Sequence, residues 1–183
     1  MNDLLMSEAA LLGLLTEETM HPYQIEKVVR ERCMREWTEL SQAAIYKLLN
    51  RMEKAGLVKK DRTVTKENRI RNTYSITKAG RAALKQKVEV VLSEPEHIRW
   101  RLDVAIYYSN SLTPKKRNDC LRTYRQNLEK RINYFKETYD YMDSIECSEH
   151  RKEIALRPVY LLEAEVKWVD AVLKKWRKEG EHG

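Results

Sequence analysis

The sequence predicts a mainly α-helical protein with an N-terminal winged helix-turn-helix, a two-stranded β wing and a C-terminal α-helical domain. Three observations predict this class. An amphipathic helix with a polar outer face is expected over 41–58, and a run rich in β-branched residues follows it. Two long helices near the C-terminus have regular apolar seams. We expect the domains to span 1–93 and 94–183, each with enough residues for a core.

The first two helices of the winged domain are short. A helix is expected over 7–15, with Ser7 as its N-cap and Glu8 in its first turn. Its apolar side comprises Ala10, Leu11, Leu14 and Leu15. The next helix is expected to start at 21–23, because Pro22 suits a first helical position, and to continue to about residue 33.

The helix expected within 41–58 has a capping residue at each end. Ser41 is a good N-cap, and Gly56 suits the left-handed position that ends a helix, with Leu57 folding back as in a Schellman motif. The buried stripe is expected to contain Ile45, Leu48, Leu49 and Met52. The opposite face, which contains no acidic residue, consists of Gln42, Ala43, Tyr46, Lys47, Asn50, Arg51 and Lys54.

A β hairpin is expected next. Residues 57–65 are rich in β-branched side chains and 73–76 alternate polar with apolar residues, which predicts two strands. The cationic tip between them, 66–72, contains Lys66, Arg69 and Arg71. A helix-turn-helix followed by such a hairpin is the winged form of the motif.

A further helix and a break separate the domains. Thr77 is expected to cap a helix that runs towards Leu92, and Ser93-Glu94-Pro95 is expected to end it. An apolar helix is expected over 96–109, and Thr113-Pro114 restarts the chain as a cap followed by a first-turn proline.

The last two helices have apolar seams that predict a C-terminal dimerisation domain. Apolar residues recur about every 3.5 residues, which lets long helices pack as a shallow left-handed coil. Candidate dimer residues are Leu121, Tyr124, Leu128, Val159, Leu162, Val166, Val169, Leu173 and Trp176. A second copy of the chain is the expected partner, and a three-helix bundle within one chain is the alternative. Pro158 either interrupts the last helix or lies near its start.

Positive charge is concentrated in one part of the chain. Residues 41–87 contain thirteen Lys or Arg and three acidic residues, a balance of +10 in a chain whose net charge is +7. A basic block with interspersed apolar residues indicates a polyanionic partner, whereas a solvated surface usually mixes both signs.

Several other classes of protein are not supported. Three widely spaced cysteines predict a reducing compartment rather than disulfides or a thiolate zinc site. The four histidines are scattered, so we expect no catalytic residues, no metal, no cofactor and no enzyme activity. The apolar run 11–15 is too short for a signal or membrane helix, and we expect a soluble cytoplasmic protein.

A set of short motifs resembles the PadR family of bacterial transcription regulators. They are Leu12-Gly13-Leu14-Leu15, His21-Pro22-Tyr23, Ala44-Ile45-Tyr46, Leu49 with Arg51-Met52-Glu53, Gly56-Leu57-Val58, Arg69 and Arg71 before Tyr74-Ser75-Ile76-Thr77, then Gly80-Arg81 and Leu84. Each motif is weak alone, but the combination is specific. The resemblance implies a homodimeric, nucleoid-associated repressor whose operator binding is relieved by small aromatic or drug-like ligands. It also implies that 164–168 belong to the final dimerisation helix.

We therefore expect a dimer that places its two 41–58 helices in successive major grooves of double-stranded DNA, about 34 Å apart. Gln42, Tyr46 and Lys47 are expected at base edges, and Asn50 and Arg51 at phosphates. The full set of expected DNA-binding residues is Ser41, Gln42, Ala43, Tyr46, Lys47, Asn50, Arg51, Lys66, Arg69 and Arg71.

An effector pocket and an alternative function are two further interpretations of the sequence. Aromatic residues that could line an effector pocket between the domains, or simply belong to a core, are Trp100, Tyr107, Tyr108, Tyr160 and Trp168. The alternative function is a winged-helix adaptor that binds a partner protein and no DNA, for which a basic block would be unnecessary.

Overall fold

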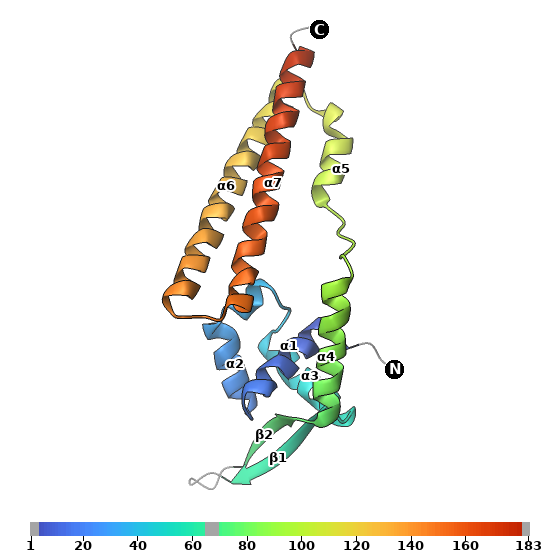
Figure 1. Cartoon of the computed structure of the whole chain (residues 1–183). Helices are drawn as coiled ribbons and strands as arrows, with labels where there is room; N and C mark the ends of the chain where they lie inside the picture. The colour runs from blue at the N-terminus through green and yellow to red at the C-terminus, as the bar shows by residue number, and fades with distance from the viewer. Residues whose placement is uncertain (1–3, 65–69, 181–183) are drawn as a thin grey trace. The chain divides into compact units, whose positions relative to one another are not determined.

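A computed structural model of the chain describes residues 4–64 and 70–180, and it is mainly helical with one small sheet (Figure 1). The chain forms two compact units, Met1–His97 and Ile98–Gly183. This architecture confirms the predicted fold class, while the separate functions expected for 1–93 and 94–183 stay predictions. The elements in order are α1 (Met6–Glu17), α2 (Pro22–Glu31), η1 (Met34–Glu36), α3 (Gln42–Lys54), β1 (Val58–Val64), β2 (Ile70–Ile76), α4 (Lys78–Ser93), α5 (Arg101–Tyr107), η2 (Ser109–Ser111), α6 (Pro114–Ser144) and α7 (Glu149–Gly180).

One hydrophobic core holds the N-terminal unit together. The predicted stripe of α3 is buried in it and meets side chains from α1, α2 and the sheet. α1 is buried on more than one side, since Leu12 is as fully buried as Leu11. The buried members of this core are Leu11, Leu12, Leu14, Leu15, Met20, Ile25, Val29, Met34, Leu40, Ile45, Leu48, Leu49, Met52, Val58 and Tyr74.

The predicted ends of α3 are confirmed. The Ser41 hydroxyl accepts a hydrogen bond from the Ala44 amide at 3.1 Å. Gly56 has φ of +70°, and the Leu57 amide donates to the Met52 carbonyl at 2.9 Å, which completes a Schellman motif. Local capping chemistry therefore determines where this helix begins and ends.

The predicted starts of α2, α4 and α6 are also confirmed. His21 is the N-cap of α2, where its Nδ1 accepts from the Gln24 amide at 3.1 Å and Pro22 takes the first helical position. The hydroxyls of Thr77 and Thr113 cap α4 and α6. Each cap satisfies an amide that has no partner within its own helix.

The two strands pair in antiparallel register, with Val58 opposite Ile76 and Val64 opposite Ile70. The second strand begins at Ile70 rather than at the expected residue 73, so part of the predicted tip is strand. Backbone pairing extends past the alternating apolar residues because each N–H and C=O group needs a partner whatever its side chain. Lys66 and Arg69 lie outside the described residues.

Two helix boundaries differ from the prediction. α1 begins at Met6, with Leu5 and not Ser7 at the N-cap position, and the Leu5 amide donates to the Glu8 carboxylate at 3.1 Å. The helix expected over 96–109 is shorter, since α5 covers Arg101–Tyr107 and has no buried residue. A short segment with little packing does not recover the free-energy cost of starting a helix, so the apolar pattern alone overstated its length.

An ion pair joins α1 to α3. Arg51 Nε lies 2.6 Å from Glu8 Oε1, and a terminal guanidinium nitrogen lies 2.6 Å from Glu8 Oε2. Glu8 is buried, with 3% of its surface exposed, whereas the Arg51 side chain is 48% exposed. The hydrogen bond to Glu8 raises the pKa of Arg51, so the guanidinium stays protonated. This two-point contact fixes the rotation of α3 relative to α1.

In the C-terminal unit, α6 and α7 lie side by side as an antiparallel hairpin (Figure 1). Hydrogen bonds between the two helices include Arg125 to Asp170 at 2.6 Å and Tyr124 to Glu165 at 2.5 Å. Burial and the Glu165 hydrogen bond raise the pKa of Tyr124 to about 12, so this phenol stays protonated and donates. Pro158 lies inside α7, which starts nine residues earlier. Within the described residues, no helix combines the length and apolarity that crossing a bilayer requires.

Gly80 provides a test of the packing between α4 and the end of α3. A Cβ at this position would lie 2.1 Å from the Leu57 carbonyl oxygen and 2.9 Å from Ile76 Cγ1. Gly80→Ala is therefore expected to lower the free energy of unfolding by about 1–3 kcal/mol, because backbone must move. Urea unfolding followed by circular dichroism measures it.

Gly13→Ala is the matched control. Gly13 lies in α1, and a Cβ there meets no atom within 4 Å. This substitution should raise the free energy of unfolding by about 0.5–1 kcal/mol, since alanine loses less backbone freedom in a helix. Equal effects of the two substitutions would contradict the packing described for Gly80.

The Glu8–Arg51 pair gives a second prediction. Arg51→Gln leaves the buried Glu8 carboxylate without its cation, so the midpoint of thermal unfolding should fall by at least about 5 °C. Glu8→Gln should also lower it, and the double variant should lose less than the sum of the two single losses. Lys54→Gln, an exposed position on the same helix, is the control and should change little. Additive losses would mean that the two side chains do not interact in solution.

Candidate nucleic-acid interface

The outer face of α3 is exposed as predicted. Its exposed side chains contain no carboxylate, because the one acidic residue of the helix, Glu53, is partly buried. The Ser41 cap and the Schellman turn hold the two ends of this face. The exposed positions among the expected DNA-binding residues are Ser41, Gln42, Ala43, Tyr46, Lys47, Asn50 and Arg51.

Arg51 differs from its neighbours on this face. Sequence analysis assigned it a phosphate contact, but its guanidinium makes two short contacts with Glu8. Within the N-terminal unit, Arg51 is therefore a link that orients the helix. The remaining exposed donors, such as Lys47 and Asn50, have no such anchor among the described residues.

Of the predicted wing residues, the structure describes Arg71 alone, by its backbone. Arg71 lies in β2, and its Cα pairs with that of Thr63. On the first strand, Lys59 forms an ion pair with Asp61 at 2.7 Å. Lys60, the next residue, projects from the opposite face of the strand, as the alternation of side chains requires.

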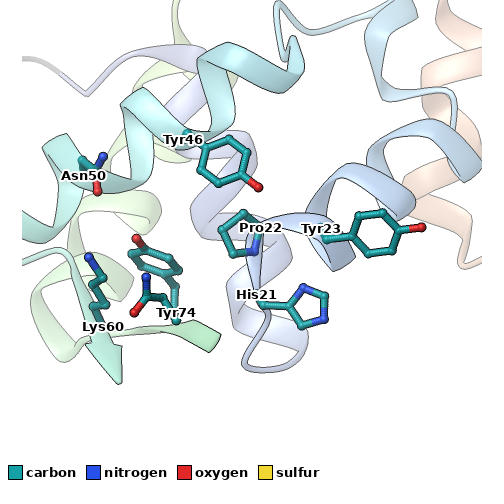
Figure 2. Close-up of a pocket in the computed structure, with 8 residues that line it drawn as sticks. His21, Pro22, Tyr23, Tyr46, Asn50, Lys60 and Tyr74 are labelled. Atoms are coloured by element: carbon teal, nitrogen blue, oxygen red, sulfur yellow. The ribbon is translucent and has the colours of Figure 1, made fainter. Parts of the chain in front are cut away.

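An open cavity of about 460 Å³ lies between α2, α3 and the sheet. Figure 2 shows Tyr46 and Asn50 of α3 on one side of it, and Lys60 and Tyr74 of the sheet nearby. The start of α2 forms the remaining wall. The lining residues are His21, Pro22, Tyr23, Tyr46, Asn50, Lys60, Asn72 and Tyr74.

Contacts far apart in the sequence build this cavity. Met20 and Tyr74 exchange backbone hydrogen bonds of 3.1 and 2.8 Å, an isolated bridge that places the start of α2 beside β2. Lys60 lies opposite Tyr74 in the register, with its ammonium 5.9 Å from the ring centre. Sequence reasoning noted 21–23 as a helix start and a family motif, but it did not identify this wall or Lys60. The strand register was the missing information.

The expected effector residues are placed in the C-terminal unit. Trp100 is the N-cap of α5, and Tyr107 and Tyr108 form an edge-to-face pair with ring centres 4.9 Å apart. Tyr160 and Trp168 lie on α7. All five are exposed, and none lines the cavity above or the second cavity of about 510 Å³ along α6 and α7. Their role in binding an effector stays a prediction.

Of the seam residues expected at a dimer interface, four are buried within a single chain and five are partly buried, and their role in a dimer stays a prediction. Leu121, Leu128 and Val169 form the centre of a cluster between α6 and α7. Val159 is also buried. The regular spacing did predict helix packing, and within one chain each seam packs against the neighbouring helix, since a short turn brings the two seams together. The others that pack around this cluster are Tyr124, Leu162, Val166, Leu173 and Trp176.

Comparison with known proteins finds a family that the N-terminal part of the chain resembles. Residues 11–86 match the family described as "Transcriptional regulator PadR-like family". No curated protein matches the chain in sequence.

Solved structures with a similar fold cover nearly the whole chain. Bacillus subtilis PadR in complex with operator DNA has a TM-score of 0.72 at 17% identity, and the match covers 92% of this chain and 98% of that one. The same protein in complex with p-coumaric acid has a TM-score of 0.70 at 17% identity, with 93% and 98% covered. The PadR-like regulator BC1756 from Bacillus cereus has a TM-score of 0.63 at 20% identity, with 94% and 99% covered. Residues 11–86 are thus similar to the PadR-like family of transcriptional regulators, and solved structures of PadR proteins share the fold of nearly the whole chain.

Proposed function

We propose that this protein is a homodimeric repressor that binds a specific operator through α3. The observation that carries the proposal is the exposed face of α3, which presents hydrogen-bond donors and cations without a carboxylate. An α-helix with such a face fits the major groove, where each base pair presents a distinct pattern of donors and acceptors. Its rigid caps support accurate placement in the groove.

The residues of this face divide by position. Gln42, Tyr46 and Lys47 lie in the first half of α3 and are proposed to contact base edges. Asn50, one turn later, is proposed to contact phosphate. The wing residues proposed to follow the DNA backbone are Lys66, Arg69 and Arg71.

The dimer is proposed to form through the C-terminal unit. Its seam is used within the chain, so a second copy must cover other surfaces. Large apolar side chains remain exposed on this unit, including Ile98, Val104, Leu112, Ile145, Ile154 and Leu161. Exposed apolar side chains in such number favour a protein partner, and a twofold dimer would present two α3 helices to two half-sites about 34 Å apart.

Selection of duplexes from a random pool by the purified protein tests the proposal. We expect a near-palindromic sequence bound by two chains, with an affinity that falls steeply between low and physiological salt as counterions are released. Lys47→Ala is expected to weaken binding of the selected duplex by about 1–3 kcal/mol and of an unrelated duplex by much less. Fluorescence anisotropy measures each affinity.

Lys54→Ala is the matched control, because Lys54 is also an exposed lysine of α3 but lies in its last turn. Its effect should be small and equal on both duplexes. A wild-type protein that binds no duplex would contradict the proposal and favour an adaptor that binds protein.

Release of the operator by a small aromatic ligand is the proposed regulatory step. Support comes from the exposed aromatic rings of the C-terminal unit and from Bacillus subtilis PadR, a protein of similar fold whose crystal structure contains p-coumaric acid. p-Coumaric acid is expected to quench tryptophan fluorescence and release DNA, and Trp100→Phe should weaken both effects. Trp37→Phe is the control, since Trp37 is about as exposed, at 48% against 51%, but lies in the N-terminal unit. An unchanged response of Trp100→Phe would count against this step.

A further inference from the structure

We propose that the cavity between α2, α3 and the sheet receives a backbone phosphodiester of duplex DNA, with Lys60 as its cation. This inference rests on the proposed function and adds a contact outside the face of α3. It assigns a role to residues at the start of α2 and on the sheet. A free phosphate is the competing occupant, because it presents the same oxyanion as a DNA phosphodiester. The experiment below separates the two.

The chemistry of the cavity wall suits an oxyanion. Its lining contains one ammonium, three phenols, an imidazole and two side-chain amides, and it contains no carboxylate. Phenol and amide groups donate hydrogen bonds to phosphate oxygens, and an ammonium adds charge. A site for a cation or for an apolar ligand would require a different lining.

Lys60 is available to bind an anion. Its side chain is only 23% exposed, so its position is restrained. Glu53 Oε2 lies 3.8 Å from the ammonium, a long ion pair that is beyond hydrogen-bond distance. The ammonium makes no hydrogen bond to any described residue. Lys59 differs, because Asp61 lies 2.7 Å from its ammonium on the other face of the strand.

Asn72 supplies an independent observation. Its side-chain oxygen is buried and accepts no hydrogen bond from the described residues. A buried polar atom without a partner is unfavourable, and exchange of the amide oxygen and nitrogen would turn a donor towards the same space. Asn72 also lines the cavity, so the wall contains a polar group that the described residues leave without a partner.

Continuity with α3 favours a DNA phosphate over a free anion. Tyr46 and Asn50 belong both to the cavity wall and to the exposed face of α3 (Figure 2). A strand whose bases meet α3 therefore passes the mouth of the cavity. A volume of about 460 Å³ exceeds that of a phosphate group alone and leaves room for the sugars on either side.

The test compares two neighbouring lysines of β1. Lys60→Gln should weaken binding of the selected duplex and of an unrelated duplex alike, roughly tenfold at low salt. The slope of log Kd against log salt concentration should fall by about 0.9 for each protomer bound. Lys59→Gln should change the slope by less than half as much, and Lys60→Arg should retain most of it. Thermal unfolding of each variant verifies that it is folded.

The possible results distinguish a failure of this inference from a failure of the proposed function. If the wild type binds duplex DNA but Lys60→Gln has the same affinity and slope, this inference is wrong and the proposed function stands. If the wild type binds no duplex, the proposed function itself fails. Titration with inorganic phosphate, followed by NMR shifts of the tyrosines, separates the occupants. Saturable phosphate binding that Lys60→Gln abolishes without any change in DNA affinity would overturn the DNA assignment.

Discussion

The Leu57 carbonyl is the point on which the N-terminal unit depends. α3 ends at Lys54, and the left-handed backbone of Gly56 turns the chain towards β1. The carbonyl then accepts from the Thr77 amide at 3.1 Å and lies 3.0 Å from the Thr77 hydroxyl. Because Gly80 has no side chain, the start of α4 packs directly against it. One short turn thus joins α3, the sheet and α4.

The exposed face of α3 has a defined orientation because the opposite face of the helix is held rigidly. The buried stripe fixes the helix axis, and the ion pair between Glu8 and Arg51 fixes rotation about that axis. The exposed donors then have defined positions relative to the sheet, which is the requirement for reading bases by geometry rather than by charge alone. Arg51 belongs to this positioning system, although its residue type suggested a direct contact with DNA.

In the C-terminal unit too, the packing of one helix face determines which side chains stay exposed. The seams of α6 and α7 meet each other because a four-residue turn places them antiparallel. That packing leaves a different set of apolar and aromatic side chains exposed. Surfaces for a second chain or for a ligand therefore have to be sought on the outer faces of these helices and on α5.

Local signals determined the element types and most of the ends. Ser41, Gly56, Thr77 and Thr113 act within four residues of their own position, so the sequence alone was enough to predict what they do. The stripe of α3 and the wing were predictable for the same reason, since periodicity of 3.6 or 2 is a short-range property.

Only the tertiary structure decided which segments meet. Glu8 and Arg51 are 43 residues apart, the cavity combines three separate segments, and each seam packs on its own chain. Apolar periodicity shows that a face is buried but not which surface buries it, because hydrophobic contact has no direction or partner preference. The short α5 also reflects tertiary packing, since it has no buried residue, whereas α1 starts early through a local contact in which the Leu5 amide donates to the Glu8 carboxylate.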